Sequence, residues 1–191
     1  MMVKICGITN REDALAAVDA GASALGFNFH PKSPRYISPA AAAEIGAGLS
    51  IIKVGVFVND PGTESIADQA GLDIVQLHGE ETPGEIPTHL RVWKAFKVTP
   101  QWEAAMMNGF AVEAFLLDGP VPGEGVPFDW TRASGMSKII LAGGLGSDNV
   151  AEAIRQARPW GVDACSRLER APGLKDHEKM RRFVRAAMDT L

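Results

Sequence analysis

Short runs of apolar and β-branched residues recur along the chain at nearly regular intervals. Eight of them begin at residues 3, 24, 51, 74, 91, 114, 138 and 161, so consecutive starts lie 17 to 27 residues apart. Such runs are typical of strands buried on both faces, as in a parallel sheet. The intervals are too long for hairpins and leave room for one helix and two short loops. The predicted strands are 3–6, 24–29, 51–57, 74–78, 91–96, 114–117, 138–141 and 161–164.

Helix-start patterns fall in the gaps between these runs. Thr9 and Glu12 have the spacing of a capping box, in which a hydroxyl and a carboxylate each satisfy a free backbone N–H. Ser38-Pro39, Thr82-Pro83 and Thr99-Pro100 each place a hydroxyl N-cap before a proline at the first helical position. The last segment, 180–191, carries an apolar stripe with the helical period. Helices are therefore predicted between the strands.

Eight alternating strand–helix units predict a parallel sheet covered by helices, which closes into a (β/α)8 barrel. The structural alternative is a doubly wound open sheet, which usually has fewer strands and often a glycine-rich turn after the first. Here the first strand ends Cys6-Gly7-Ile8-Thr9, without the G-x-G-x-x-G pattern. A single barrel domain over residues 1–191 would have minimal length, with little chain left for lids or a second domain.

The composition narrows the class of protein. A hydrophobic fraction of 46% with 22% charged residues predicts a folded globular chain rather than a disordered one. The net charge of −4 argues against nucleic acid as a partner. Glu44 and Lys53 interrupt the longest apolar stretch, 40–58, which argues against a membrane span. Two cysteines and no signal-peptide pattern at the first residues predict a cytoplasmic location.

Residues at the carboxyl ends of the strands are the candidates for chemistry, because barrel enzymes react there. The Gly143-Gly144 pair follows the seventh strand, and barrels often bind phosphate with the loops after strands seven and eight. Glycines let backbone N–H groups approach an anion closely, although a plain tight turn is the alternative. After the eighth strand, Ser166 and Arg167 offer a hydroxyl and a charged donor. The histidines and the two cysteines show no metal-ligand spacing, so no metal is expected.

Nine segments together resemble the signatures of the phosphoribosylanthranilate isomerase family. They are residues 4–9, 33–37, 54–59, 76–79, 116–118, 128–130, 141–145, 161–163 and 171–176. The matches run in order along nearly the whole chain. The resemblance implies a (β/α)8 barrel that catalyses the Amadori rearrangement of N-(5-phosphoribosyl)anthranilate in tryptophan biosynthesis. It also implies that the enzyme needs no metal or organic cofactor.

The resemblance further implies that Cys6 is the general base and Asp118 the general acid. An acid must protonate the ring oxygen to open the sugar, and a base must remove the proton from C2. A free thiol titrates near ~8.5, so Cys6 needs nearby groups that stabilise its thiolate. For an isolated thiol and carboxyl, a buried inert cysteine and an aspartate that caps a helix are the alternatives.

The expected binding groups surround this pair. The resemblance implies that Arg35 holds the anthranilate carboxylate, since a guanidinium matches a carboxylate with two parallel bonds. The phosphate is assigned to the loops with Gly143, Gly144, Ser166 and Arg167. His78 is expected to line the pocket, although a structural histidine is the alternative. Lys4 shares side-chain parity with Cys6 and could therefore pair with Asp163, the remaining predicted substrate-site residue.

Two segments depart from the family pattern, both at the phosphate end. The loop 119–127 is shorter than usual, contains three prolines, and has Glu124 where the family carries small neutral residues. After the eighth strand, Arg167 stands where the family has glycine, so that it either forms a salt bridge or fills the anion site. These changes leave open a repurposed or non-catalytic paralogue that binds a related anionic ligand. The expected partner is a small phosphorylated molecule, and the expected assembly is a monomer or homodimer.

Cys165 adds a hypothesis of its own. Strands one and eight are neighbours in a closed barrel, so Cys6 and Cys165 would lie close together. Oxidation could then link the two sulfurs and silence the base.

Overall fold

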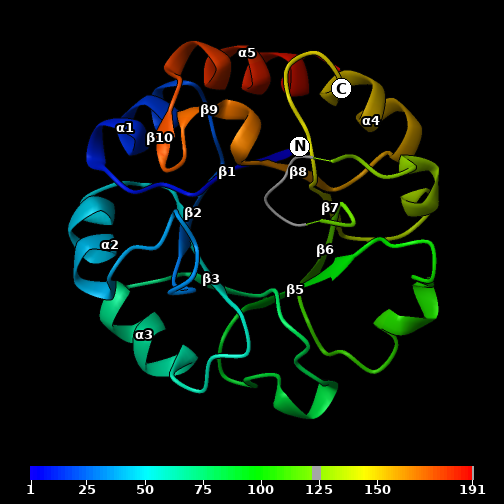
Figure 1. The fold of residues 1–191 in the computed structure, drawn as a ribbon, viewed down its shortest axis with the longest axis horizontal. Helices are drawn as coiled ribbons and strands as arrows, with labels where there is room; N and C mark the ends of the chain where they lie inside the picture. Colours follow the sequence, from blue (N-terminus) through cyan, green and yellow to red (C-terminus); the bar gives the residue numbers. More distant parts are fainter. Residues whose placement is uncertain (122–125, 191) are drawn as a thin grey trace.

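The computed structural model describes residues 1–121 and 126–190 of the chain. Eight parallel strands pair in sequence order, and β8 pairs back to β1, so the sheet closes into a barrel (Figure 1). The strands are β1 (Met2–Cys6), β2 (Ala24–Asn28), β3 (Ile52–Phe57), β4 (Ile74–Leu77), β5 (Val92–Lys97), β6 (Ala114–Asp118), β7 (Ile139–Leu141) and β8 (Gly161–Ala164). Each bound lies within one residue of the sequence-based prediction. The predicted barrel is confirmed.

Helices surround the barrel, but not one in every gap. The α-helices of the described residues are α1 (Arg11–Asp19), α2 (Pro39–Gly46), α3 (Thr63–Ala70), α4 (Val150–Ala157) and α5 (His177–Met188). Between β4 and β7 the connections instead contain the short 3₁₀ turns η1 (Pro83–Glu85), η2 (Ala104–Met107) and η3 (Trp130–Ala133). The expectation of a helix in each gap is wrong here. These three connections carry repeated proline and glycine, which interrupt a helix.

The helix starts follow the predicted residues only in part. Ser38 caps α2 by accepting from the Ala41 N–H, with Pro39 in the first turn, as predicted. The predicted Thr9 cap is wrong: Asn10 Oδ1 accepts from the Asp13 N–H at 2.8 Å, and the Thr9 hydroxyl donates to the carbonyl of Gly173 instead.

Of the two threonine–proline pairs, one forms the predicted cap and the other does not. Thr82 does form its capping box with Glu85, but on the single turn η1. Thr99-Pro100 starts no helix, because η2 begins only after Glu103.

Two apolar layers hold the barrel, one between strands and helices and one inside. The interior layer contains Met2, Ala24, Val54, Ile74, Trp93, Ala95, Ala114, Leu116, Ile140 and Ala142. Because side chains alternate along a strand, Met2, Lys4 and Cys6 all point inward at successive heights. The register places Lys4 beside Asp163 and Cys6 beside Gly26. The apolar lower interior thus supports a polar layer at the carboxyl ends of the strands.

The chain between β8 and the last helix forms a small unit of its own. The turn η4 (Ser166–Leu168) is followed by an antiparallel hairpin of β9 (Glu169–Ala171) and β10 (Leu174–Lys175). This hairpin lies beside α1 and β1 (Figure 1). Among the described residues, no helix is long and apolar enough to cross a membrane.

Candidate active site

A cavity of about 440 Å³ opens at the carboxyl ends of the strands. All nine residues predicted for the site line it: Cys6, Arg35, His78, Asp118, Gly143, Gly144, Asp163, Ser166 and Arg167. His30 and Cys165 line it too. Residues from β1, β2, β4, β6, β7 and β8 and their following loops therefore meet in one hollow, although their catalytic and binding roles stay predictions.

Cys6 lies at the end of β1 above a buried ion pair. Lys4 Nζ is 3.1 Å from Asp163 Oδ1, and the Lys4 side chain is fully buried, so the pairing predicted from side-chain parity is present. Burial alone would lower the pKa of Lys4, but the negative charges of Asp163 and Cys6 outweigh burial and raise it. Burial raises the pKa of Asp163 to about 7, against the opposing effect of Lys4. The ammonium thus remains charged beside the thiol.

A second thiol lies next to Cys6. Ile5 pairs with Ala164 across β1 and β8, which makes Cys165 the neighbour of Cys6, and both cysteines are free. A side-chain hydrogen bond from Cys165 lowers the pKa of the Cys6 thiol most, burial opposes it, and Lys4 adds to the lowering. The same contact and burial raise the pKa of Cys165. A lowered pKa is what a thiolate base at Cys6 requires. Cys165 Sγ also lies 3.9 Å from Glu169 Oε1, to which its S–H donates. Their oxidation to a disulfide stays a prediction.

Asp118 is held at the end of β6 by its neighbours. Its Oδ1 accepts from the Gly119 N–H at 2.8 Å, and its Oδ2 lies 3.2 Å from His78 Nε2. Gln76 Nε2 is 3.1 Å from His78 Nδ1. Among the described residues, His78 Nε2 makes no hydrogen bond. His78 thus lies beside the Asp118 carboxyl, while the Gly119 N–H is the group that holds it.

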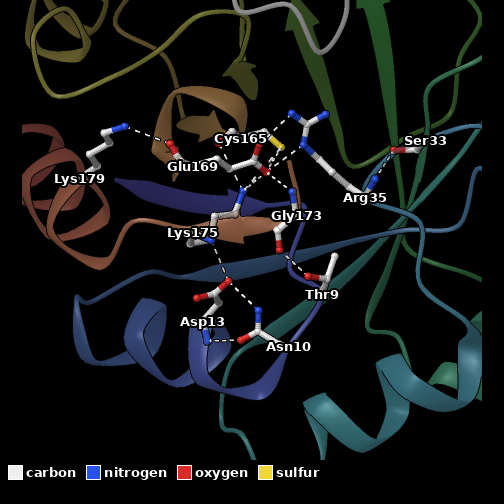
Figure 2. A network of polar contacts seen from close by, with 10 residues as sticks. All are labelled: Thr9, Asn10, Asp13, Ser33, Arg35, Cys165, Glu169, Gly173, Lys175 and Lys179. Atoms are coloured by element: carbon white, nitrogen blue, oxygen red, sulfur yellow. Dashed lines mark hydrogen bonds and ion pairs between the residues drawn. The ribbon is translucent and has the colours of Figure 1, made fainter. Parts of the chain in front are cut away.

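The Arg35 guanidinium is bound to the Glu169 carboxylate, as Figure 2 shows. Its Nε and Nη2 donate to the two carboxylate oxygens of Glu169 at 2.9 Å and 2.8 Å. Lys175 Nζ donates to the same carboxylate at 2.9 Å. The bond to Glu169 raises the pKa of Arg35, which keeps the guanidinium charged. The expected substrate arginine thus already has an acidic partner.

The loop after β7 has an unusual backbone conformation at its glycine pair. Gly143 and Gly144 both have positive φ, +77° and +68°, a conformation that other residues adopt only with strain. A Cβ on Gly143 would lie 2.2 Å from the Gly119 N atom, so the loops after β6 and β7 touch here. The α4 helix begins a few residues further on, at Val150. Gly143 therefore does more than turn the chain, because the close packing against Gly119 also leaves no room for a side chain at this position.

Of the two expectations for Arg167, a salt bridge or a side chain that fills the anion site, the structure shows the salt bridge. Arg167 Nη1 donates to the Gly144 carbonyl at 3.0 Å, and its Nη2 pairs with Asp148 at 2.9 Å. The side chain thus ties the loop after β8 to the loop after β7 rather than lying unbound in the cavity. Glu124, the other departure, lies outside the described residues.

Glu169 and Lys175 were not among the predicted site residues, although both are buried: Glu169 binds Arg35, and Lys175 binds Glu169. Lys97, Asn28 and Gln76 also line the cavity without having been selected. Among the described residues, no group of three or more acidic, histidine or cysteine side chains is arranged to hold a metal ion.

A family model described as N-(5'-phosphoribosyl)anthranilate (PRA) isomerase matches residues 3–186. The chain belongs to this family. The N-(5'-phosphoribosyl)anthranilate isomerase of Solibacter usitatus is 52% identical over 198 residues, which cover 100% of this chain and 99% of that protein. A relative this similar over its full length does not favour the alternative of a repurposed paralogue.

Solved structures agree with this membership. The phosphoribosyl anthranilate isomerase of Thermus thermophilus superposes with a TM-score of 0.93 at 37% identity, and all of both chains is covered. A further isomerase structure, with a TM-score of 0.84, 38% identity and 99% of each chain covered, was solved with reduced 1-(o-carboxyphenylamino)-1-deoxyribulose 5-phosphate bound. The barrel is thus that of the isomerase family.

Proposed function

We propose that this chain catalyses the Amadori rearrangement of N-(5-phosphoribosyl)anthranilate to 1-(2-carboxyphenylamino)-1-deoxyribulose 5-phosphate. The observation that carries the proposal is the meeting of Cys6 and Asp118 in one cavity. They come from strands that are not neighbours, β1 and β6, so an acid and a base can reach one bound sugar from different sides. The lowered pKa of Cys6 suits a base, and membership of the isomerase family supports the reaction type.

The first step is the opening of the sugar ring. The protonated Asp118 carboxyl gives its proton to the ring oxygen, and the bond from that oxygen to C1 breaks. The nitrogen lone pair forms the C1=N double bond of an iminium ion, and the ring oxygen becomes a hydroxyl. The Gly119 N–H holds the carboxyl in position for this transfer, with His78 beside it.

The second step is proton removal from C2. The Cys6 thiolate takes this proton, the released pair forms the C1=C2 bond, and the iminium electrons return to nitrogen. The resulting enol amine becomes the ketose when C1 gains one proton and the C2 hydroxyl loses one. Proton transfer by positioned groups is worth ~10²–10⁴-fold in rate. The product is an isomer of the substrate, and both residues regain their starting states.

The remaining residues orient the two charged ends of the substrate. Arg35 is assigned to the anthranilate carboxylate, because it is the charged guanidinium at the β2 side of the cavity. The phosphate is assigned to the opposite loops, where Gly143 and Gly144 leave room and Ser166 and Arg167 add donors. Asp163 acts beneath the substrate through its pair with Lys4.

A steady-state assay of the purified chain tests the function. The substrate is generated enzymatically, and its anthranilate-type fluorescence is followed as it is consumed. We expect a saturable decay that depends on the concentration of the chain and is absent in the Cys6→Ala variant. A chain that is folded by circular dichroism yet leaves the fluorescence unchanged contradicts the proposal.

We also propose that the protein works in the cytoplasm on this small phosphorylated molecule, as a monomer or homodimer, with neither nucleic acid nor membrane as a partner. The net charge of −4 and the two free cysteines support this setting. Sedimentation velocity at micromolar concentration distinguishes the two assemblies from larger ones.

A further inference from the structure

Glu169 is a buried carboxylate beside the cavity that the proposed chemistry does not use. Only 4% of its side chain is exposed, yet it accepts from several donors at once. Besides the two bonds from Arg35 and one from Lys175, the Gly173 N–H lies 3.3 Å from its Oε1. Burial alone would raise the pKa of Glu169, but Arg35 and Lys175 outweigh burial and lower it. The carboxylate is therefore ionised and well satisfied.

The hairpin after β8 holds this carboxylate in a fixed place (Figure 2). The β9–β10 register pairs Lys175 directly with Glu169. The backbone on both sides is anchored: Lys179 Nζ donates to the Glu169 carbonyl at 3.0 Å, and the Lys175 N–H donates to Asp13 at 2.9 Å. Because the hairpin is anchored on both sides, the Glu169 carboxylate is held in place and in turn fixes the orientation of any side chain that it binds.

The geometry of the guanidinium decides what Arg35 can still do. Its N–H groups lie in one plane and form two separate edges that can each bind a carboxylate. Glu169 takes the edge formed by Nε and Nη2. The edge formed by Nη1 and the second Nη2 hydrogen is left for another anion, and Arg35 lines the cavity.

The charges around Glu169 favour an incoming anion. One carboxylate is shared by two cations, Arg35 and Lys175, so the cluster keeps one positive charge in excess. Without Lys175, the charge of Glu169 would cancel that of Arg35. Lys175 thus allows an acidic side chain to position Arg35 without neutralising the site.

We propose that Glu169 is a positioning residue that fixes the free edge of Arg35 toward the carboxylate of the substrate, with Lys175 as its charge partner. This inference rests on the proposed function, because it assumes a substrate with a carboxylated aromatic ring. The alternative is that Glu169 competes with the substrate for Arg35. In that case Glu169 weakens substrate binding, and its removal strengthens it. Replacing Glu169 therefore lowers the affinity if it positions Arg35 and raises the affinity if it competes.

Glu169→Gln is the variant that separates them. Glutamine keeps the size of the side chain but replaces one acceptor oxygen with an NH₂ group, which cannot accept from the guanidinium. Arg35 then loses one of its two parallel bonds and is free to tilt. Because small misplacements of a binding group cost up to ~10²-fold, we expect KM to rise on the order of 10- to 100-fold while kcat changes less than about 3-fold.

The matched control lies elsewhere on the barrel. Glu113 binds Arg91 with the same two parallel bonds, at 2.7 Å and 2.9 Å, just before β6 begins. Glu113→Gln therefore breaks an equivalent pair away from the cavity. Glu169→Asp is the second variant, which keeps the charge but withdraws it by one methylene. We expect an intermediate effect from it.

The decisive measurement is calorimetric binding of two ligands to the full chain and its variants. One ligand is reduced 1-(o-carboxyphenylamino)-1-deoxyribulose 5-phosphate, and the other is the same compound without the ring carboxyl. We expect Glu169→Gln to weaken the first ligand on the order of 10- to 100-fold and the second less than about 3-fold, with no change in Glu113→Gln.

Each other outcome overturns the proposal. Equal weakening of both ligands makes Glu169 a structural residue only, and tighter binding of the first ligand makes it a competitor. If Glu169→Gln does not fold, an unchanged preference for the carboxylated ligand in Glu169→Asp refutes the proposal. Failure of the proposed function is distinct from all of these, because it is measured in the turnover assay: the wild-type chain would then leave the substrate fluorescence unchanged, whichever ligand the variants bind.

Discussion

The ion pair beneath Cys6 gives the sharpest prediction about how the base is prepared. Lys4 is fully buried and lies 3.1 Å from Asp163. Replacing Lys4 with methionine removes the charge but keeps most of the side-chain volume. Removing one partner of a buried pair costs ~3–5 kcal/mol in the free energy of unfolding. For a chain of this size, that corresponds to a drop in Tm of roughly 6–20 °C.

The cost of Lys4→Met should depend on pH, and the sign follows from Asp163. Its pKa in the folded protein is about 7, above its ordinary value of 3.8, and loss of Lys4 raises it further. A folded state that binds a proton more tightly is stabilised at low pH, and this stability is lost as pH rises through the folded pKa. Neutral Asp163 tolerates burial without Lys4, whereas ionised Asp163 does not. The destabilisation should therefore be smallest near pH 5 and grow above pH 7.

The effect on catalysis follows from the thiol. Lys4 is one of the groups that lower the pKa of Cys6. A nearby positive charge favours the thiolate, so Lys4→Met should raise the pKa of Cys6. The base works only when deprotonated. The acid limb of the kcat/KM profile should therefore move to higher pH, with recovery of activity in alkaline buffer.

Two assays check this reasoning in the same variants. Iodoacetamide alkylation of Cys6, followed by peptide mass spectrometry from pH 5 to 10, reports its thiolate fraction directly, and kcat/KM is measured over the same range. Lys53→Met is the control, because Lys53 pairs with Asp73 at 3.5 Å and is partly exposed. Its loss should cost less than ~1 kcal/mol and move neither profile. An acid limb of Lys4→Met that coincides with the wild type would refute the electrostatic argument.

Three further predictions concern the loops and the second thiol. Gly143→Ala should raise KM and lower Tm, because φ is +77° and the new Cβ would lie 2.2 Å from the Gly119 N atom; Gly135→Ala, with φ +78° and open space around its Cβ, should keep its activity. Arg167→Ala removes the bonds to Gly144 and Asp148, so KM should rise several-fold with kcat nearly unchanged, and an unchanged KM counts against its place in the phosphate site. Oxidised glutathione should link Cys6 to Cys165, taking two electrons and two protons from the thiols to give two glutathione molecules; activity should fall, return with dithiothreitol, and survive in Cys165→Ser. Activity that oxidant and reductant leave unchanged contradicts the link.

The barrel could be predicted because its strands carry a local pattern. Each strand is buried on both faces, so its apolar run is continuous and its bounds are readable to within a residue. The connections between β4 and β7 were less predictable, since a hydroxyl and a proline start a 3₁₀ turn as readily as a helix. Whether Thr9 or Asn10 caps α1 depends on a contact with a residue distant in the sequence, so neighbouring residues could not predict it. The Gly173 carbonyl, far along the chain, binds the Thr9 hydroxyl.

The site was predictable where it lies at strand ends, because topology alone gathers those residues. Arg35 and Glu169 are 134 positions apart, so no local pattern joins them. A partial indication was present: Pro172-Gly173 favours a turn, with Glu169 before it and Lys175 after it. A hairpin built on that turn would have placed the acid opposite the base. Which arginine the carboxylate then binds depends on the closed barrel, since β8 returns to β1 and β2 only when the sheet closes.

Cys6 and Asp118 are proposed to exchange protons with one bound sugar, and the decisive measurement of this pair is the turnover number of Cys6→Ala and Asp118→Ala. Both variants should bind reduced 1-(o-carboxyphenylamino)-1-deoxyribulose 5-phosphate nearly as well as the wild type and keep its circular dichroism spectrum. We predict that kcat falls by at least ~10²–10⁴-fold in each. A variant that turns over at the wild-type rate contradicts the role given to its residue.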